Sequence, residues 1–417
     1  MQNLKIFLVA AVILLAPPTL AQSNKAKPKQ GASAASGASK NAAASAIAPN
    51  SQVNLPGAPP VSIAARSWLL LDVTTGQTLA AYEPDVKVEP ASLTKLMTAY
   101  LAFSALKEKK LTLDARPPVS PLAYKAEGSR MFVDPAKPAT VEELLNGMIV
   151  QSGNDASIIL AEAVAGSEQV FSELMNKEAK RLGMKNSQYR NATGLPHPEH
   201  YATANDLAIL TRRLITDHPT FYSLYSSKEY TYNNIKQPNR NRLLLIDPTV
   251  DGVKTGHTDA AGYCLITSSK RDAVGGGLPR RLIAVVLGAA SESARVIESQ
   301  KLLNFGFQNF DALKLYSKGQ VVANYPVWKG KANEVVASFD QDVLITVAKG
   351  QNDKIKADIE RIETLVAPIA AGQRLGTLKI KLNDKVLLER PVIAQAAIEE
   401  AGFFGRQYDA IRMMLKK

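Results

Sequence analysis

Cysteine and histidine are scarce in this chain of 417 residues, and their scarcity excludes several kinds of protein. The single cysteine, Cys264, can form no disulfide within the chain, and its place in the apolar run 262–266 favours a buried thiol over a nucleophile. Only four histidines are present, which leaves few ligands for a metal centre. His197 and His200 flank Pro198-Glu199, but this spacing differs from the helical His-Glu-x-x-His motif, and the prolines oppose a helix. We therefore expect no metal.

Signals for nucleic-acid binding are missing as well. The sequence contains no zinc-finger spacing, no RNA-binding motif and no arginine-rich run, so we expect no nucleic-acid partner. The net charge is nevertheless +12, from 50 lysines and arginines against 38 aspartates and glutamates. Such a surplus suits an anionic lipid surface or a cell-wall polymer, and a solvated basic surface without a partner is the alternative. The apolar content of 46% is sufficient for cores that need neither disulfides nor metals.

The first 60 residues predict export followed by a tether. Lys5 precedes the apolar run 6–16, and Thr19-Leu20-Ala21 is a plausible cleavage site before Gln22. Because this run is too short to cross a membrane comfortably, residues 1–21 are expected to be a signal peptide, with an uncleaved anchor as the alternative. Residues 22–60 are mostly Ala, Ser, Pro, Lys and Asn with almost no large apolar side chain, so we expect a disordered tether.

Residues 61–312 carry the pattern of an α+β domain. Strand patterns lie at both ends of this segment and helical patterns lie between them. The expected strands are 68–72, 78–82, 261–267 and 281–287. The expected helices are 92–106, 141–150, 155–165, 206–215 and 293–305. Such an order favours one sheet covered by helices.

Two further segments follow. Residues 313–401 predict a small β-rich domain, from strand-like runs within 334–348 and an alternating hairpin at 378–390, and no cluster in it resembles a catalytic site. Residues 402–417 predict an amphipathic helix with a basic rim. Its apolar positions are Phe404, Tyr408, Ile411 and Leu415. An anionic membrane surface suits this helix, and docking on its own domain is the alternative.

Three short motifs predict the chemistry. In Ser92-Leu93-Thr94-Lys95, residues i and i+3 share a helix face, so the amine of Lys95 can reach the hydroxyl of Ser92 and act as a base. Burial and a neighbouring positive charge, for which Lys254 is the candidate, would lower the pKa of Lys95 enough for that role. The same spacing recurs at Ser104 and Lys107, which we interpret as ordinary helix surface.

The second and third motifs supply groups for a peptide substrate. In Ser152-Gly153-Asn154 the hydroxyl of Ser152 can pass a proton to a leaving amine, and the amide of Asn154 can hold a peptide group. A second Ser-x-Asn, at 39–41, lies within the tether. In Lys254-Thr255-Gly256, which precedes a strand, the lysine and the hydroxyl suit a terminal carboxylate, and the glycine permits close approach of substrate backbone.

Taken in this order, the motifs resemble those of the D-alanyl-D-alanine carboxypeptidases, the low-molecular-mass penicillin-binding proteins. The likeness extends to the residues around each motif and covers about 61–417. The matching segments are 91–97, 151–156, 239–241, 251–258, 295–307 and 402–406. The resemblance implies a transpeptidase-like domain of the β-lactamase type, with an antiparallel sheet covered by helices, then the β-rich domain and the amphipathic helix.

The resemblance also implies a role for each matching residue. The catalytic residues would be Ser92 as nucleophile, Lys95 as its base, and Ser152, Asn154 and Lys254. The substrate-binding residues would be Thr255, Gly256, His257, Arg240 and Arg295. The oxyanion hole would be the backbone N–H groups of Ser92 and His257. Arg242 stands where a small residue is expected and would alter access to the cleft.

The implied reaction removes the terminal D-alanine from peptidoglycan pentapeptide stems through an acyl-enzyme on Ser92, without a metal or cofactor. β-Lactam antibiotics would acylate the same serine. The implied location is the periplasmic face of the bacterial inner membrane, with peripheral attachment through residues 402–417. A D,D-endopeptidase on cross-linked peptides is the nearest alternative. A serine β-lactamase, which needs a glutamate that residues 186–190 lack, and a non-catalytic wall-binding protein are the others.

Overall fold

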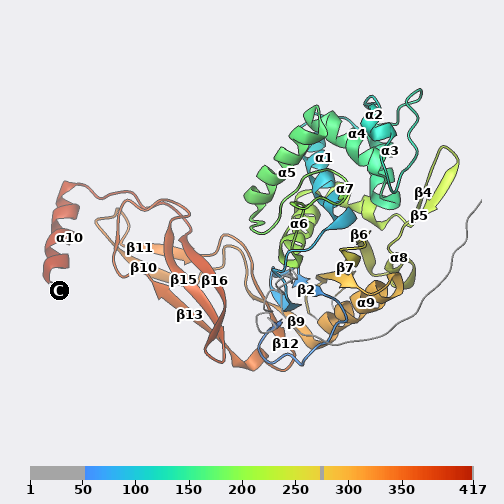
Figure 1. Cartoon of the computed structure of the whole chain (residues 1–417). Coiled ribbons are helices and arrows are strands. Elements are labelled where there is room, and N and C mark those ends of the chain that lie inside the picture. The colour runs from blue at the N-terminus through green and yellow to red at the C-terminus, as the bar shows by residue number, and fades with distance from the viewer. Residues whose placement is uncertain (1–51, 273–276, 416–417) are drawn as a thin grey trace, which may run out of the picture. The chain divides into compact units, whose positions relative to one another are not determined.

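The computed structural model describes residues 52–272 and 277–415, so the predicted signal peptide and most of the predicted tether lie outside the described residues (Figure 1). Strand β1 (Gln52–Asn54) pairs antiparallel with β3 (Thr78–Tyr82). Leu55 and Val61 then pack against a buried core. The tether prediction was therefore wrong for residues 52–60, because their few apolar side chains find a sheet edge and a core to cover.

A six-stranded antiparallel sheet forms the centre of the first domain, in the order β1-β3-β2-β8-β7-β6. Its remaining strands are β2 (Ser67–Asp72), β6 (Val250–Thr258), β7 (Gly262–Arg271) and β8 (Arg280–Ala289). Alternate residues of β2 point to opposite faces, so Leu69 joins one core and Leu70 the other. Both faces of the sheet are thus buried.

Helices cover these two faces. The larger core includes α1 (Lys95–Lys107), α4 (Asn154–Ala165) and α6 (Ala204–Asp217), whereas α9 (Glu292–Asn309) covers the other face. The further helices are α2 (Pro121–Tyr124), α3 (Val141–Asn146), α5 (Glu168–Leu182), α7 (Pro219–Tyr222) and α8 (Leu243–Ile246). Short 3₁₀ segments are η1 (Ala91–Thr94) and η3 (Ser223–Ser226), and a hairpin is formed by β4 (Glu229–Tyr232) and β5 (Ile235–Pro238). The predicted α+β class is confirmed.

The C-terminal domain is built from β-strands around a third core. One sheet has the order β13-β15-β16-β11-β10-β14, and β9 (Phe310–Tyr316) pairs separately with β12 (Val343–Ala348). The strands of the larger sheet are β10 (Ala323–Trp328), β11 (Glu334–Ser338), β13 (Ile355–Arg361), β14 (Leu365–Val366), β15 (Arg374–Leu382) and β16 (Lys385–Ala394). The short η4 (Asn352–Lys354) precedes β13. The expected hairpin corresponds to β15 and β16.

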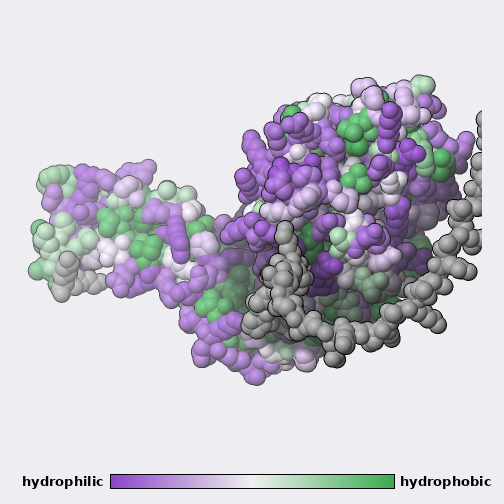
Figure 2. Space-filling model, in the orientation of Figure 1, coloured by the Kyte–Doolittle hydropathy of each residue, from purple (hydrophilic) through white to green (hydrophobic). Residues whose placement is uncertain are grey.

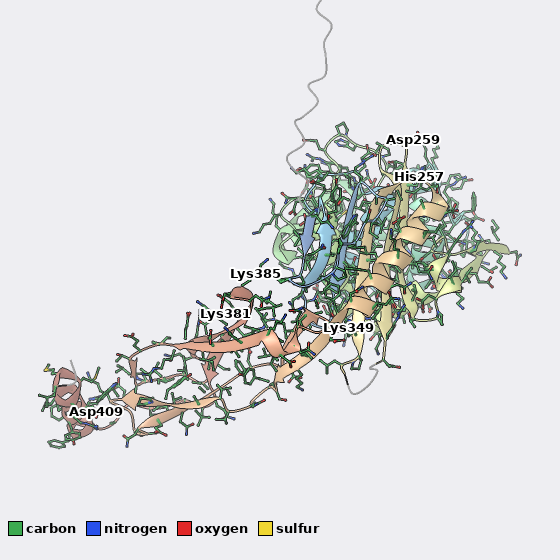
Figure 3. All side chains as sticks on the ribbon, turned by 90° about the horizontal axis from the view of Figure 1, so that it is seen from below. His257, Asp259, Lys349, Lys381, Lys385 and Asp409 are labelled. Atoms are coloured by element: carbon green, nitrogen blue, oxygen red, sulfur yellow. The ribbon has the colours of Figure 1, made fainter. Side chains whose placement is uncertain are left out.

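Helix α10 (Phe403–Leu415) leaves most of its apolar residues in solvent. Phe404 is 86% exposed and Leu415 82%, and Figure 2 shows green, apolar surface at this end of the chain. The helix contacts its own domain through polar groups instead: Asp409, labelled in Figure 3, accepts a hydrogen bond of 2.6 Å from the backbone N–H of Lys329. Among the described helices, none is both long and apolar enough to cross a bilayer.

Candidate active site

The turn that carries Ser92 is tightly enclosed by two glycines. Ser92 lies in η1, one turn before α1, rather than inside the α-helix that the sequence predicts. A Cβ atom on Gly256 of β6 would stand 3.0 Å from the carbonyl oxygen of Pro90, and one on Gly194 would overlap the carbonyl of Ala91. The missing side chain of Gly256 lets β6 pack against the turn that carries Ser92, and the expectation that it also gives room to substrate backbone stays a prediction.

Lys95 is held by three acceptors from three different segments. Its Nζ donates to Ser92 Oγ at 3.2 Å, to Asn154 Oδ1 at 2.7 Å and to the carbonyl oxygen of Thr193 at 2.6 Å. The side chain is buried, with 1% of its surface exposed. The motif Ser-x-x-Lys therefore brings the amine to the hydroxyl as predicted, and the two other acceptors fix its position.

Burial and, to a lesser extent, the nearby guanidinium of Arg240 lower the pKa of Lys95 to about 7, against an opposing effect of Asp155. The sequence prediction named Lys254 as the neighbouring charge, whereas the cation that lowers the pKa of Lys95 is Arg240. A lysine with this pKa is neutral in about half of the molecules at pH 7. It can therefore accept a proton from the serine hydroxyl.

A break in helical geometry presents the second motif. Helix α3 passes into the π-helical segment η2 (Gly147–Gln151), which ends at Ser152 in a left-handed conformation with φ of 63°. A non-glycine residue rarely adopts this conformation, and such residues cluster at functional sites. The Oγ of Ser152 is buried and has no hydrogen-bond partner among the described residues. A ligand that supplied one would remove the cost of an unpaired buried hydroxyl.

Asn154 links the lysine to a neighbouring loop. Its Oδ1 accepts from Lys95, and its Nδ2 donates to the carbonyl oxygen of Glu127 at 2.6 Å. The following residue, Asp155, accepts hydrogen bonds from the backbone N–H groups of residues 131–133 and so fixes the loop before α3. Sequence analysis did not identify Asp155 or Glu127, because each acts through a contact between segments distant in sequence.

The third motif lies on strand β6, which packs against the turn that carries Ser92. Lys254 and Thr255 are buried, and Lys254 pairs across the sheet with Ile266 of β7. Burial, together with the charges of Lys95, Arg240 and Arg295, holds the pKa of Lys254 well below its usual range. An anion placed here would relieve this concentration of positive charge.

The arginines predicted from the resemblance are both close to this motif. Arg295 is buried, and its Nη1 donates to the carbonyl oxygen of Gly256 at 3.4 Å. Arg240 is exposed, and its charge lowers the pKa of both Lys95 and Lys254. Arg242 lies nearby in sequence and pairs with Glu292 at 3.2 Å, as an exposed ion pair.

His257, labelled in Figure 3, follows the third motif directly. Its ring packs against Tyr263 of β7, with the ring centroids 4.1 Å apart. The oxyanion role that the resemblance implies concerns the backbone N–H of His257 and not its ring, and it stays a prediction.

The loop that carries Asn191 and Thr193 completes the site. The side-chain oxygen of Asn191 accepts from the backbone N–H groups of Thr193 and Gly194, which orders the loop that contacts Lys95. Further along, His200 is buried with Nε2 2.9 Å from Thr94 Oγ1, and burial lowers its pKa to about 4. In the described part of the chain, no group of acidic, cysteine and histidine side chains is arranged to hold a metal ion.

Known proteins share this arrangement. Residues 52–291 match the D-alanyl-D-alanine carboxypeptidases, and residues 310–400 match the C-terminal domain of penicillin-binding protein 5. The D-alanyl-D-alanine carboxypeptidase DacC of Escherichia coli (strain K12) is 40% identical over 360 residues, which span 84% of this chain and 88% of that protein. The chain belongs to the D-alanyl-D-alanine carboxypeptidase family.

Solved structures of this family agree with the fold. Penicillin-binding protein 5 from Haemophilus influenzae aligns with a TM-score of 0.78 at 37% identity, over 82% of this chain and all (100%) of that one. Penicillin-binding protein D2 from Listeria monocytogenes, in its ampicillin-bound form, aligns with a TM-score of 0.54 at 31% identity, over 60% of this chain and 99% of that one. The carboxypeptidase is thus a serine-type enzyme, and the β-lactamase and the non-catalytic wall protein are set aside.

Proposed function

We propose that this carboxypeptidase removes the terminal D-alanine from peptidoglycan pentapeptide stems through an acyl-enzyme on Ser92. The observation that carries the proposal is the buried Lys95, whose Nζ lies 3.2 Å from Ser92 Oγ and whose pKa is about 7. The neutral amine takes the hydroxyl proton while Ser92 Oγ attacks the carbonyl between the two D-alanines. The backbone N–H groups of Ser92 and His257 stabilise the oxyanion.

The leaving D-alanine is bound by the positive side of the site. Its carboxylate is held by Lys254 and Thr255, with Arg240 and Arg295 adding charge. The unpaired hydroxyl of Ser152 relays a proton to the departing amine. Water then hydrolyses the acyl-enzyme, and a β-lactam enters the same sequence of steps because its ring amide and carboxylate imitate the dipeptide.

On the acyl side, Asn154 holds the substrate. An amide nitrogen carries two hydrogens, and one of them is used on the carbonyl oxygen of Glu127. The second donates to a backbone carbonyl of the stem peptide. The same side chain thereby fixes both the lysine base and the substrate.

Intact-protein mass after incubation with benzylpenicillin tests the nucleophile, with Ser92→Ala as the matched variant. A penicilloyl adduct on the wild type alone supports the assignment, and an adduct on Ser92→Ala of native fold contradicts it. Release of D-alanine from a peptide ending in D-Ala-D-Ala then tests the reaction. Cleavage of a cross-linked dimer of stem peptides at a higher rate than this release would favour the D,D-endopeptidase.

We also propose that the enzyme is exported and lies on the periplasmic face of the bacterial inner membrane, attached peripherally by α10. The support is the exposure of the apolar residues of that helix, for example Phe404 at 86% and Ile411 at 59%, beside basic residues such as Arg406 and Arg412. Apolar burial and attraction to anionic headgroups act together in such a helix, so binding should weaken with salt.

Sedimentation with vesicles that contain phosphatidylglycerol tests this attachment. Ile411→Asp should reduce the bound fraction severalfold, because it places a charge on the apolar face. Val321→Asp is the control, because Val321 is a similarly exposed (54%) apolar residue outside the helix. Equal binding of the two variants would contradict the proposal.

A further inference from the structure

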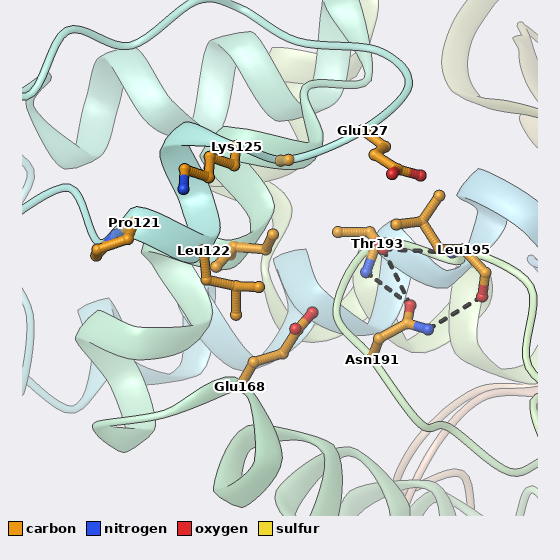
Figure 4. A pocket seen from close by; sticks show the side chains of 10 residues that line it. Pro121, Leu122, Lys125, Glu127, Glu168, Asn191, Thr193 and Leu195 are labelled. Carbon is orange, nitrogen blue, oxygen red and sulfur yellow. Dashed lines mark hydrogen bonds between the residues drawn. The ribbon is translucent and has the colours of Figure 1, made fainter.

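A pocket of about 570 Å³ opens beside the catalytic lysine and has no role in the steps above. It lies between α2, the segment that follows it, α4, the start of α5 and the loop that contacts Lys95 (Figure 4). Its lining residues are Pro121, Leu122, Lys125, Ala126, Glu127, Ile158, Glu168, Asn191, Thr193 and Leu195. We call it the acyl-side pocket.

Two of its lining residues also hold the catalytic side chains. The carbonyl oxygen of Thr193 accepts from Lys95 Nζ, and the carbonyl oxygen of Glu127 accepts from Asn154 Nδ2, each at 2.6 Å. The pocket therefore adjoins the catalytic centre on the side of Asn154. The leaving carboxylate is assigned to Lys254 on β6, so the pocket is available to the other end of the substrate, the acyl part.

The lining combines an apolar surface with an excess of negative charge. Leu122, Ile158 and Leu195 supply apolar contacts, while Glu127 and Glu168 outnumber the one cation, Lys125. Such a lining suits an alkyl chain that ends in an ammonium group, because the chain covers the apolar side chains and the charge meets a carboxylate.

Glu168 is the better ordered of the two carboxylates. Its Oε1 accepts a hydrogen bond of 2.9 Å from the backbone N–H of Ala192, and Figure 4 shows its side chain directed into the pocket between Leu122 and Asn191. Burial raises the pKa of Glu168, so a cation brought beside it would compensate for lost hydration. Glu127 is exposed and lies at the end of the pocket nearer to Asn154.

We propose that the acyl-side pocket binds the amine-bearing side chain of the stem peptide, that of its diamino acid, with the ammonium group beside Glu127 and Glu168. This assignment rests on the proposed carboxypeptidase function, and it names the part of the substrate that the pocket would bind. The enzyme should accordingly distinguish substrates by a charge that lies several bonds from the scissile peptide.

Two tripeptides test the pocket. Nα-acetyl-L-Lys-D-Ala-D-Ala carries a free side-chain amine, and the Nα,Nε-diacetyl form lacks that charge. We expect the wild type to show a kcat/KM for D-alanine release that is about three- to tenfold higher for the free amine, as for one charge-assisted hydrogen bond that is partly exposed. Glu127→Gln and Glu168→Gln should each lower this ratio, and the double variant should bring it to about one. The glutamine at 168 keeps an oxygen for the N–H of Ala192.

Glu173→Gln is the matched control, because Glu173 lies exposed on the same helix as Glu168 but does not line the pocket, and its ratio should stay at the wild-type value. A loss of activity that affects both tripeptides equally leaves the ratio of their kcat/KM values unchanged. A wild-type ratio of one, or a ratio that both pocket variants leave unchanged, would overturn the pocket assignment alone. Failure of both tripeptides to release D-alanine, with no acylation of Ser92 by benzylpenicillin, would overturn the proposed function instead.

Discussion

Acylation of Ser92 should depend on pH through the protonation state of Lys95. Burial and Arg240 lower the pKa of this amine to about 7, so the neutral fraction is about 9% at pH 6 and about 91% at pH 8. A lysine with its ordinary pKa of 10.5 would be neutral in fewer than about one molecule in 1,000 at pH 7. Because only the neutral amine accepts the proton, the acylation rate should rise about tenfold between these pH values and then level off.

The assay is the second-order rate constant for a fluorescent penicillin, measured at constant ionic strength from about pH 5.5 to 9. Removing a cation near Lys95 raises its pKa, so Arg240→Gln should move the midpoint to higher pH, whereas Arg240→Lys should keep it near 7. Lys107→Ala, at the duplicate Ser-x-x-Lys spacing, should leave the profile unchanged. A wild-type midpoint above pH 9, or a rate independent of pH, would refute a lysine base.

Three further outcomes are expected. Gly194→Ala places a methyl group against the backbone carbonyl of Ala91 at a φ of 87°, and it should lower the free energy of unfolding by about 3 kcal/mol. Gly183→Ala is the control, because Gly183 has the same φ of 87° with open space around it, and it should lower the free energy of unfolding by only about 1 kcal/mol. Equal losses in denaturant unfolding would contradict the packing argument. Asn154→Ala removes an acceptor 2.7 Å from the lysine amine and should slow acylation by about tenfold to hundredfold, and a wild-type rate would count against its positioning role. Burial lowers the pKa of His200 from 6.5 to about 4, so the folded state favours the neutral ring. The free energy of unfolding therefore includes the full contribution of His200 above about pH 6.5 and loses up to about 3 kcal/mol as the pH falls toward 4. His200→Asn should flatten this part of the curve of Tm against pH, and an unaltered curve would exclude that contribution.

Patterns within short segments of the sequence were sufficient to predict most of the strands and helices. The strand at Trp68, the helix after Asn154 and the hairpin around Lys379 follow from alternation or helical spacing within the segment itself. Helix α5 was not predicted, although Ser167 caps its N-terminus and Phe171 begins a spacing of four between buried residues. That helix could have been found from the sequence.

The contacts that complete the site could not be predicted in the same way. The carbonyl of Thr193 reaches Lys95 across 98 positions of the chain, and a main-chain oxygen leaves no trace in residue identity. The π-helical turn before Ser152 has no composition that distinguishes it from an α-helix. Arg240 lowers the pKa of Lys95 because of its place in space, whereas the sequence suggested the more familiar Lys254.

The three acceptors around Lys95 also decide which way its lone pair points. A neutral amine keeps two hydrogens, and the two shorter contacts, at 2.7 Å to Asn154 and 2.6 Å to Thr193, are the ones that retain them. Deprotonation therefore turns the nonbonding electrons toward the remaining neighbour, Ser92 Oγ at 3.2 Å. The side chain of Asn154 and the carbonyl of Thr193 therefore fix the orientation of the amine. When Lys95 loses one proton to solvent, its lone pair already points at the hydroxyl of Ser92.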